Sequence, residues 1–168
     1  MAGQRGGRPV SRDRDPSGRP RNARPRDEYG RPLPRGAAGV ERVPDDYAPS
    51  GEDAVAEAAR LLGERRPFHA HEVLEARWKN APDDERELWQ GLAQVCVGLT
   101  HLQRGNARGA AALLTRGADR VQTYAGREPY RMDVPGVVRL ARALVADPGQ
   151  EVDPAIDALR TRLEGEPG

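Results

Sequence analysis

The sequence predicts an all-α protein, a compact bundle of about five to six helices preceded by an irregular N-terminal arm. From residue 51 onward, apolar residues recur every three or four positions, which is the period of an amphipathic helix. No stretch shows the alternation of apolar and polar residues that is typical of a strand. The first 50 residues have neither period and are rich in Arg, Pro and Gly.

Residues 1–48 are expected to form the arm. Gly-Arg-Pro recurs at 7–9, 18–20 and 30–32, and proline restricts the backbone while little in this stretch is apolar enough to be buried. The first 50 residues hold 11 arginines, no lysine and seven acidic residues, so a net charge of +1 conceals a basic arm on a mildly acidic body. Two interpretations are open, a solvated tail or an arm whose second half docks on the body. Docking would use Tyr29, Leu33, Val40, Val43 and Tyr47.

Residues 49–168 form the predicted helical domain. The first helix is expected at about 51–65, with Ser50 as its N-cap. Pro67 suits the first turn of a second helix that ends near Asn80. The acidic turn at 83–85 favours the start of a third helix.

Punctuating residues define the remaining helices. Gly105 is expected to end the third helix, and Asn106 to cap a fourth that stops near Gly126. Asp133 is expected to cap a fifth helix that runs to about Ala146. Asp153 and Pro154 are expected to open the last helix.

The chain has one cysteine, Cys96, in its most apolar segment, where it is expected to be a buried core residue. It cannot form an intramolecular disulfide, so a reducing, cytoplasmic setting is the default expectation. No segment approaches the roughly 20 apolar residues of a membrane span, and the N-terminus lacks the apolar region of a secretory signal.

The second helix carries an unusual polar stripe. His71 and Glu75 lie about 40° apart around the helix, and Trp78 lies within about 20° of His71. Glu72 points about 100° away, so it could support the stripe or be an exposed charge. His69 points across the helix. Both tryptophans, Trp78 and Trp89, are interpreted as packing residues of the core and its rim.

The third helix carries a matching stripe, formed by Gln90, Gln94 and His101. Because the two helices are joined by a few residues, they should pack antiparallel, with His71 level with Gln94 and Glu75 level with Gln90. His101 should lie about 10 Å further along. The sequence thus predicts an enclosed polar site formed by His71, Glu72, Glu75, Trp78, Gln90, Gln94 and His101.

Three hypotheses fit such a site, and they leave open whether it is catalytic. His71, Glu75 and His101 could bind a divalent metal, because two imidazoles and a carboxylate leave one position open for water. The two glutamines are weak metal ligands and indicate instead a small polar ligand. Alternatively, the stripe is a hydrogen-bond network without catalysis, in a structural or interaction module.

Other chemistry is poorly supported. His71-Glu72 resembles the start of the zinc-protease motif, but Glu75 replaces its second histidine. The sequence contains no phosphate-binding glycine loop between a strand and a helix. Acidic residues interrupt the arginines of the arm, which disfavours nucleic-acid binding.

The third helix also bears a leucine stripe, from Leu88 to Leu102, on the side opposite its polar stripe. Both sides therefore need cover. Either this helix is central in the domain, or a second subunit covers one side and the protein is a homo-oligomer.

These residues resemble the prokaryotic domain-of-unknown-function family numbered 309. The resemblance rests on His71-Glu-Val-Leu-Glu75-x-x-Trp78, on Gln90-Gly-Leu-x-Gln94, and on His101 followed by Gly105-Asn106-x-x-Gly109. It covers about residues 55–125. It implies a small helical domain with these polar residues as its signature, and it implies no established activity.

Overall fold

The computed structural model describes residues 26–27, 30–33, 39 and 43–165. These residues contain no strand, only one isolated bridge between Arg26 and Pro32, so the all-α prediction is confirmed. The α-helices are α1 (Gly51–Gly63), α2 (Pro67–Asn80), α3 (Arg86–Gln103), α4 (Ala107–Gln122), α5 (Val134–Ala146) and α6 (Val152–Leu163). Two short 3₁₀ turns, η1 (Asp83–Glu85) and η2 (Pro129–Arg131), precede α3 and α5.

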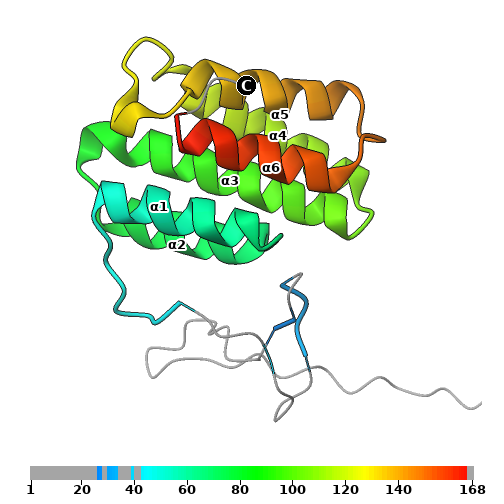
Figure 1. Cartoon of the computed structure of the whole chain (residues 1–168), viewed down its shortest axis with the longest axis horizontal. Helices are drawn as coiled ribbons and strands as arrows, with labels where there is room; N and C mark the ends of the chain where they lie inside the picture. The colour runs from blue at the N-terminus through cyan, green and yellow to red at the C-terminus, as the bar shows by residue number, and fades with distance from the viewer. Residues whose placement is uncertain (1–25, 28–29, 34–38, 40–42, 166–168) are drawn as a thin grey trace, which may run out of the picture.

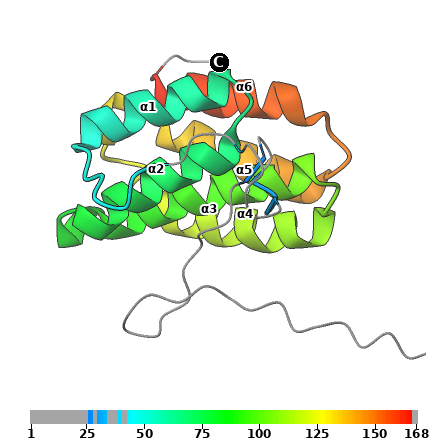
Figure 2. The same cartoon turned by 90° about the horizontal axis from the view of Figure 1, so that it is seen from below.

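The helices close into a ring around one core. Each helix packs against the next along the chain, and α6 returns to pack against α1. The two views show the helices running roughly along the long axis of the molecule, with α1 and α6 on the side opposite α3 and α4 (Figures 1 and 2). The α3 helix contacts α2, α4 and α6. The leucine side of α3 is therefore covered within the domain, as in the first of the two alternatives that its opposed stripes predicted.

The leucine stripe of α3 faces the core, where Leu88, Leu92 and Leu99 are at most 1% exposed. On the side that faces α4, α3 carries glycines in place of larger residues. A Cβ atom added at Gly98 would lie only 2.6 Å from Cγ of Leu114 on α4. Small residues therefore let α3 and α4 approach closely.

The predicted N-caps of three helices are confirmed. The side chains of Ser50, Asn106 and Asp133 accept hydrogen bonds from the third residue after each of them. Gly105, at φ +74°, ends α3 in the left-handed conformation that glycine adopts without strain.

Helix ends differ from the prediction where tertiary contacts intervene. The α1 helix ends at Gly63, and the chain then turns through Arg65 at φ +61°. The α4 helix ends at Gln122, because Tyr124 turns inward and donates its hydroxyl to the Asp84 carbonyl at 2.6 Å. The α6 helix begins at Val152, one residue before the expected start at Asp153. The side chain of its N-cap residue, Glu151, makes no capping hydrogen bond.

The described part of the arm contacts the body. Val43 and Tyr47 pack against the core, and Leu33 is half-buried. Gly30 is buried at φ +73°, directly against the Phe68 ring, and the Arg26 guanidinium lies 5.2 Å from the centre of that ring. These contacts support docking of the second half of the arm. The other two residues expected to dock, Tyr29 and Val40, lie outside the described residues.

Within the described ranges, no helix has the length and apolarity needed to cross a membrane.

Candidate functional site

The α2 and α3 helices line a pocket of about 190 Å³ between their polar stripes. Its lining, here called the α2–α3 pocket, consists of His71, Glu75, Trp78, Gln90, Ala93, Gln94 and Val97. The side chain of His71 is 19% exposed and that of Glu75 is 40% exposed. The pocket is therefore open to solvent, which corrects the expectation of an enclosed site. The reason is that the stripes lie at the outer edge of the α2–α3 contact, while the leucine stripe fills the interior.

His71 and Glu75 form the charged part of the α2 wall. Nε2 of His71 lies 3.0 Å from Oε2 of Glu75, and Nδ1 of His71 lies 3.0 Å from the Phe68 carbonyl. Both neighbours are hydrogen-bond acceptors, so each ring nitrogen of His71 faces an acceptor.

Glu75 is held in its ionised form. Its hydrogen bond to His71 lowers the pKa of the carboxyl, which burial would otherwise raise. The second oxygen, Oε1, lies 3.6 Å from Nζ of Lys79. The α2 wall is thus a row of polar groups in contact with one another, formed by Lys79, Glu75 and His71.

Trp78 supplies the aromatic wall of the pocket. It is half-buried, packs against the edge of the core and lies 5.6 Å from the Arg86 guanidinium. Trp89 differs because it is fully buried and donates its indole N–H to Glu85 at 3.1 Å. Trp89 is therefore a packing residue, as interpreted from the sequence, whereas Trp78 both packs against the core and lines the pocket.

The α3 wall presents two amides above an apolar floor. Oε1 of Gln94 accepts a hydrogen bond from Nε of Arg120 on α4, at 3.2 Å. In the part of the chain that the structure describes, no group hydrogen-bonds the Gln90 side chain. Nor does any hydrogen bond among the described residues join His71 or Glu75 to Gln90 or Gln94. The two stripes face a shared space and do not satisfy one another.

Two predicted members lie outside the pocket. Glu72 is half-buried beside it but does not line it. His101 accepts a hydrogen bond on Nδ1 from the Asn106 side chain, at 3.0 Å, and the same Asn106 caps α4. Burial lowers the pKa of His101, and the charge of Arg104 lowers it further. His101 is therefore a neutral partner of the α4 cap.

The geometry does not assemble the metal site hypothesised from His71, Glu75 and His101. Among the described residues, which include all three, no three His, Cys, Asp or Glu side chains are grouped so as to hold a metal ion. The physical reason is distance along α3, because His101 lies seven residues, or about 10 Å, beyond Gln94. His71 and Glu75 instead bind each other.

Sequence reasoning missed three contributors to the site. Ala93 and Val97 form the pocket floor, and Val97 could have been found because it continues the Gln90–Gln94 stripe by one helical turn. Arg120 could not have been found from the sequence, because its contact with Gln94 depends on how closely α4 packs on α3.

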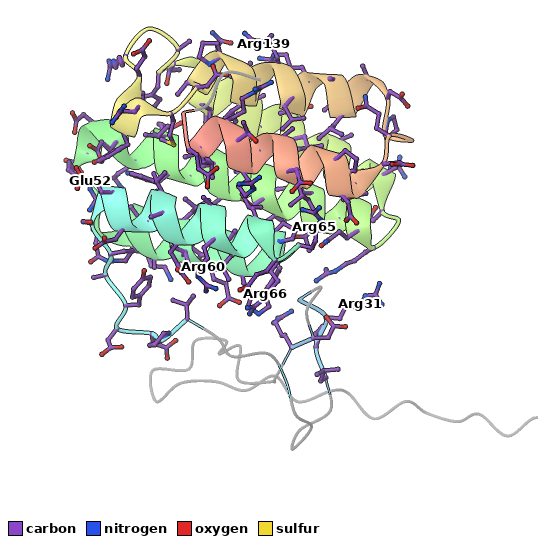
Figure 3. All side chains as sticks on the ribbon, viewed as in Figure 1. Arg31, Glu52, Arg60, Arg65, Arg66 and Arg139 are labelled. Atoms are coloured by element: carbon purple, nitrogen blue, oxygen red, sulfur yellow. The ribbon has the colours of Figure 1, made fainter. Side chains whose placement is uncertain are left out.

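A second hollow, of about 410 Å³, lies on the other side of α2, between α1 and the arm. His69, only 1% exposed, lines it together with Tyr47 of the arm, so His69 points away from the α2–α3 pocket as predicted. Arg60 and Arg66 also line this hollow and lie along the α1–α2 edge (Figure 3).

Comparisons with known proteins agree with the resemblance seen in the sequence. Residues 55–113 match the family described as "Domain of unknown function (DUF309)". A similar protein, "Uncharacterized protein YpuF" of Bacillus subtilis (strain 168), is 42% identical over 48 residues, which cover 28% of each chain. No solved structure matches the chain. The whole α2–α3 pocket lies inside the matched region, whereas Arg120 lies beyond it. Residues 55–113 are thus similar to the DUF309 family, in agreement with the resemblance seen in the sequence.

Proposed function

We propose that the α2–α3 pocket binds a small polar ligand. The observation that carries this proposal is the position of the polar groups: imidazole, carboxylate and amides line one hollow without hydrogen-bonding one another across it. Exposed polar groups that converge on a concave surface are typical of a binding site. The volume of about 190 Å³ is below that of pockets for drug-sized molecules, which favours a ligand of few atoms.

The two tryptophans supply an internal control for the test. Titrating ¹⁵N-labelled protein with a library of small polar fragments should shift the indole N–H resonance of Trp78, which lines the pocket. The resonance of Trp89 should stay in place, because that ring is fully buried and its N–H is bound to Glu85. Fragments that shift neither resonance, or both equally, would count against the pocket.

A pair of leucine substitutions sharpens the test. Ala93→Leu places a larger side chain in the floor of the pocket and should abolish the Trp78 response. Ala112→Leu makes the same change at an exposed position of α4 and should leave the response intact. If Ala93→Leu binds fragments as the wild type does, the ligand site lies elsewhere.

A second candidate is an interaction module, including a homodimer. It is supported by the exposure of the pocket, where Trp78 and Glu75 are open to a partner surface. Light scattering after gel filtration, over a hundredfold range of concentration, tests self-association. A constant monomer mass would exclude the homodimer, whereas a dimer that Trp78→Ala dissociates would favour it over a small-ligand site.

A further inference from the structure

The orientation of the Gln94 amide follows from its partner. Arg120 donates Nε–H to Gln94 at 3.2 Å, and a guanidinium has no hydrogen-bond acceptor. The atom of Gln94 that faces Arg120 must therefore be the oxygen, Oε1. Because Gln94 also lines the pocket, its NH₂ group is what remains for a ligand.

Arg120 is itself fixed in place. Its NH1 atom lies 2.7 Å from both carboxylate oxygens of Glu87, so one guanidinium joins two residues of α3 from its position on α4. Such a cross-helix contact needs a long side chain that starts close to α3.

Two glycines supply that proximity. A Cβ atom added at Gly91 would lie 2.9 Å from Cβ of Arg120, and one added at Gly117 would lie 2.8 Å from the Gly91 carbonyl oxygen. The backbones of α3 and α4 thus nearly touch beside the pocket. Arg120 leaves α4 beside Gly91, and Gly91 lies three residues before Gln94 on α3.

We infer that Arg120 is a positioning residue of the α2–α3 pocket, which turns Gln94 so that the pocket offers a hydrogen-bond donor on its α3 wall. The inference rests on the proposed ligand-binding function. A ligand that uses this donor must present an acceptor such as a carbonyl oxygen.

The opposite wall narrows the ligand class. Glu75 is an ionised carboxylate there, so it accepts hydrogen bonds, and a carboxylate ligand has no N–H to donate to it. A donor on α3 and an acceptor on α2 together suit a neutral amide group, whose C=O accepts from Gln94 and whose N–H donates to Glu75. The ligand class is therefore an amide, including the amide-like edge of a ring.

The first experiment needs no ligand. The variant Arg120→Met keeps the apolar stem against Gly91 but removes the guanidinium, and it should shift and broaden the side-chain NH₂ resonances of Gln94. The matched control is Arg142→Met, which removes a different cross-helix pair, Arg142–Asp119 at 3.0 Å, and should leave those resonances unchanged. Unchanged Gln94 resonances in Arg120→Met, or equal changes in both variants, would overturn the positioning role.

The second experiment measures the ligand class, with the Trp78 indole resonance as readout. Of three probes, acetamide should bind more tightly than acetate or methylammonium, and Arg120→Met should weaken acetamide about fivefold, as expected for one hydrogen bond. Acetate or methylammonium binding as tightly as acetamide would overturn the amide assignment. If no probe moves Trp78 in the wild type, the proposed function fails, while the ligand-free experiment still judges Arg120.

Discussion

The Tyr130 hydroxyl donates to the Glu85 carboxylate at 2.8 Å and ties η2 to the turn that precedes α3. The same carboxylate accepts hydrogen bonds from the Trp89 indole at 3.1 Å and from the Arg77 guanidinium at 3.2 Å. Tyr130 has φ 53°, a left-handed conformation that costs free energy outside glycine. Glu85 therefore joins α2, α3 and η2 through three donors and holds a strained turn.

Glu85→Ala should lower the free energy of unfolding by about 2–4 kcal/mol, because it leaves three partly buried donors without their acceptor. Urea denaturation measures the change. Asp83→Ala, in the same turn but with a fully exposed side chain, should change stability by less than about 0.5 kcal/mol. Equal effects of the two substitutions would show that Glu85 acts only through the charge of the turn.

Glu85 should also make stability depend on pH. Burial alone would raise the pKa of its carboxyl, but hydrogen bonds from Tyr130, Trp89 and Arg77 lower it below the usual value. A lowered pKa means that the stabilisation is full above the unfolded-state pKa, near 4.5, and is lost as pH falls through the folded-state pKa. Unfolding curves between pH 7 and pH 3 should therefore show a smaller loss of stability in Glu85→Gln than in the wild type.

Glu75→Gln should have little effect on stability. The His71–Glu75 pair is open to solvent, so its loss should lower the free energy of unfolding by less than about 1 kcal/mol. Denaturation and the Trp78 fragment response are measured on the same sample. The small-ligand proposal expects a weak stability change with a lost response, whereas a large loss of stability would support the structural-network hypothesis.

Gly98→Ala should destabilise the contact between α3 and α4. The added methyl group would lie 2.6 Å from Cγ of the fully buried Leu114, so the core must shift at a cost of about 1–3 kcal/mol. Gly126→Ala is the control, because no atom lies within 4 Å of the added carbon there. Thermal unfolding of the two variants should therefore differ, and equal melting temperatures would contradict the close packing.

Cys96 should be unreactive in the folded protein. Burial raises the pKa of its thiol to about 12, so almost no thiolate forms at neutral pH. A thiol reagent should modify Cys96 only as fast as the protein opens, and the rate should rise steeply with urea. Rapid labelling without denaturant would show that α3 is accessible where the structure buries it.

Much of the fold could be predicted from local sequence signals. Ser50, Asn106 and Asp133 act as caps through contacts within three residues, so tertiary structure was not needed to find them. The pocket could also be predicted, because the short link after Asn80 fixes α2 and α3 as neighbours and the helical period then places Glu75 near Gln90.

The remaining features depend on contacts that a helical period does not encode. The end of α4 is set by Tyr124 reaching Asp84, some 40 residues earlier in the chain. The role of His101 depends on the path of the turn to Asn106, and the contact of Arg120 depends on the depth at which α3 and α4 pack. The sequence did not predict that the pocket is open to solvent. A stripe of polar residues indicates the side of the helix on which these side chains lie, but not how deeply they are buried.

The packing of Val43 and Tyr47 has a practical consequence for dissecting the protein. A fragment that starts at residue 49 would match the predicted domain but would strip both side chains from the core and leave their apolar contact sites on α1 and α2 exposed to water. It would also bring the new terminus next to the Pro49 carbonyl, which accepts a hydrogen bond from Arg77 at 3.4 Å. An expression fragment that begins at residue 43 keeps Val43 and Tyr47 on the helical body, whereas one that begins at residue 49 does not.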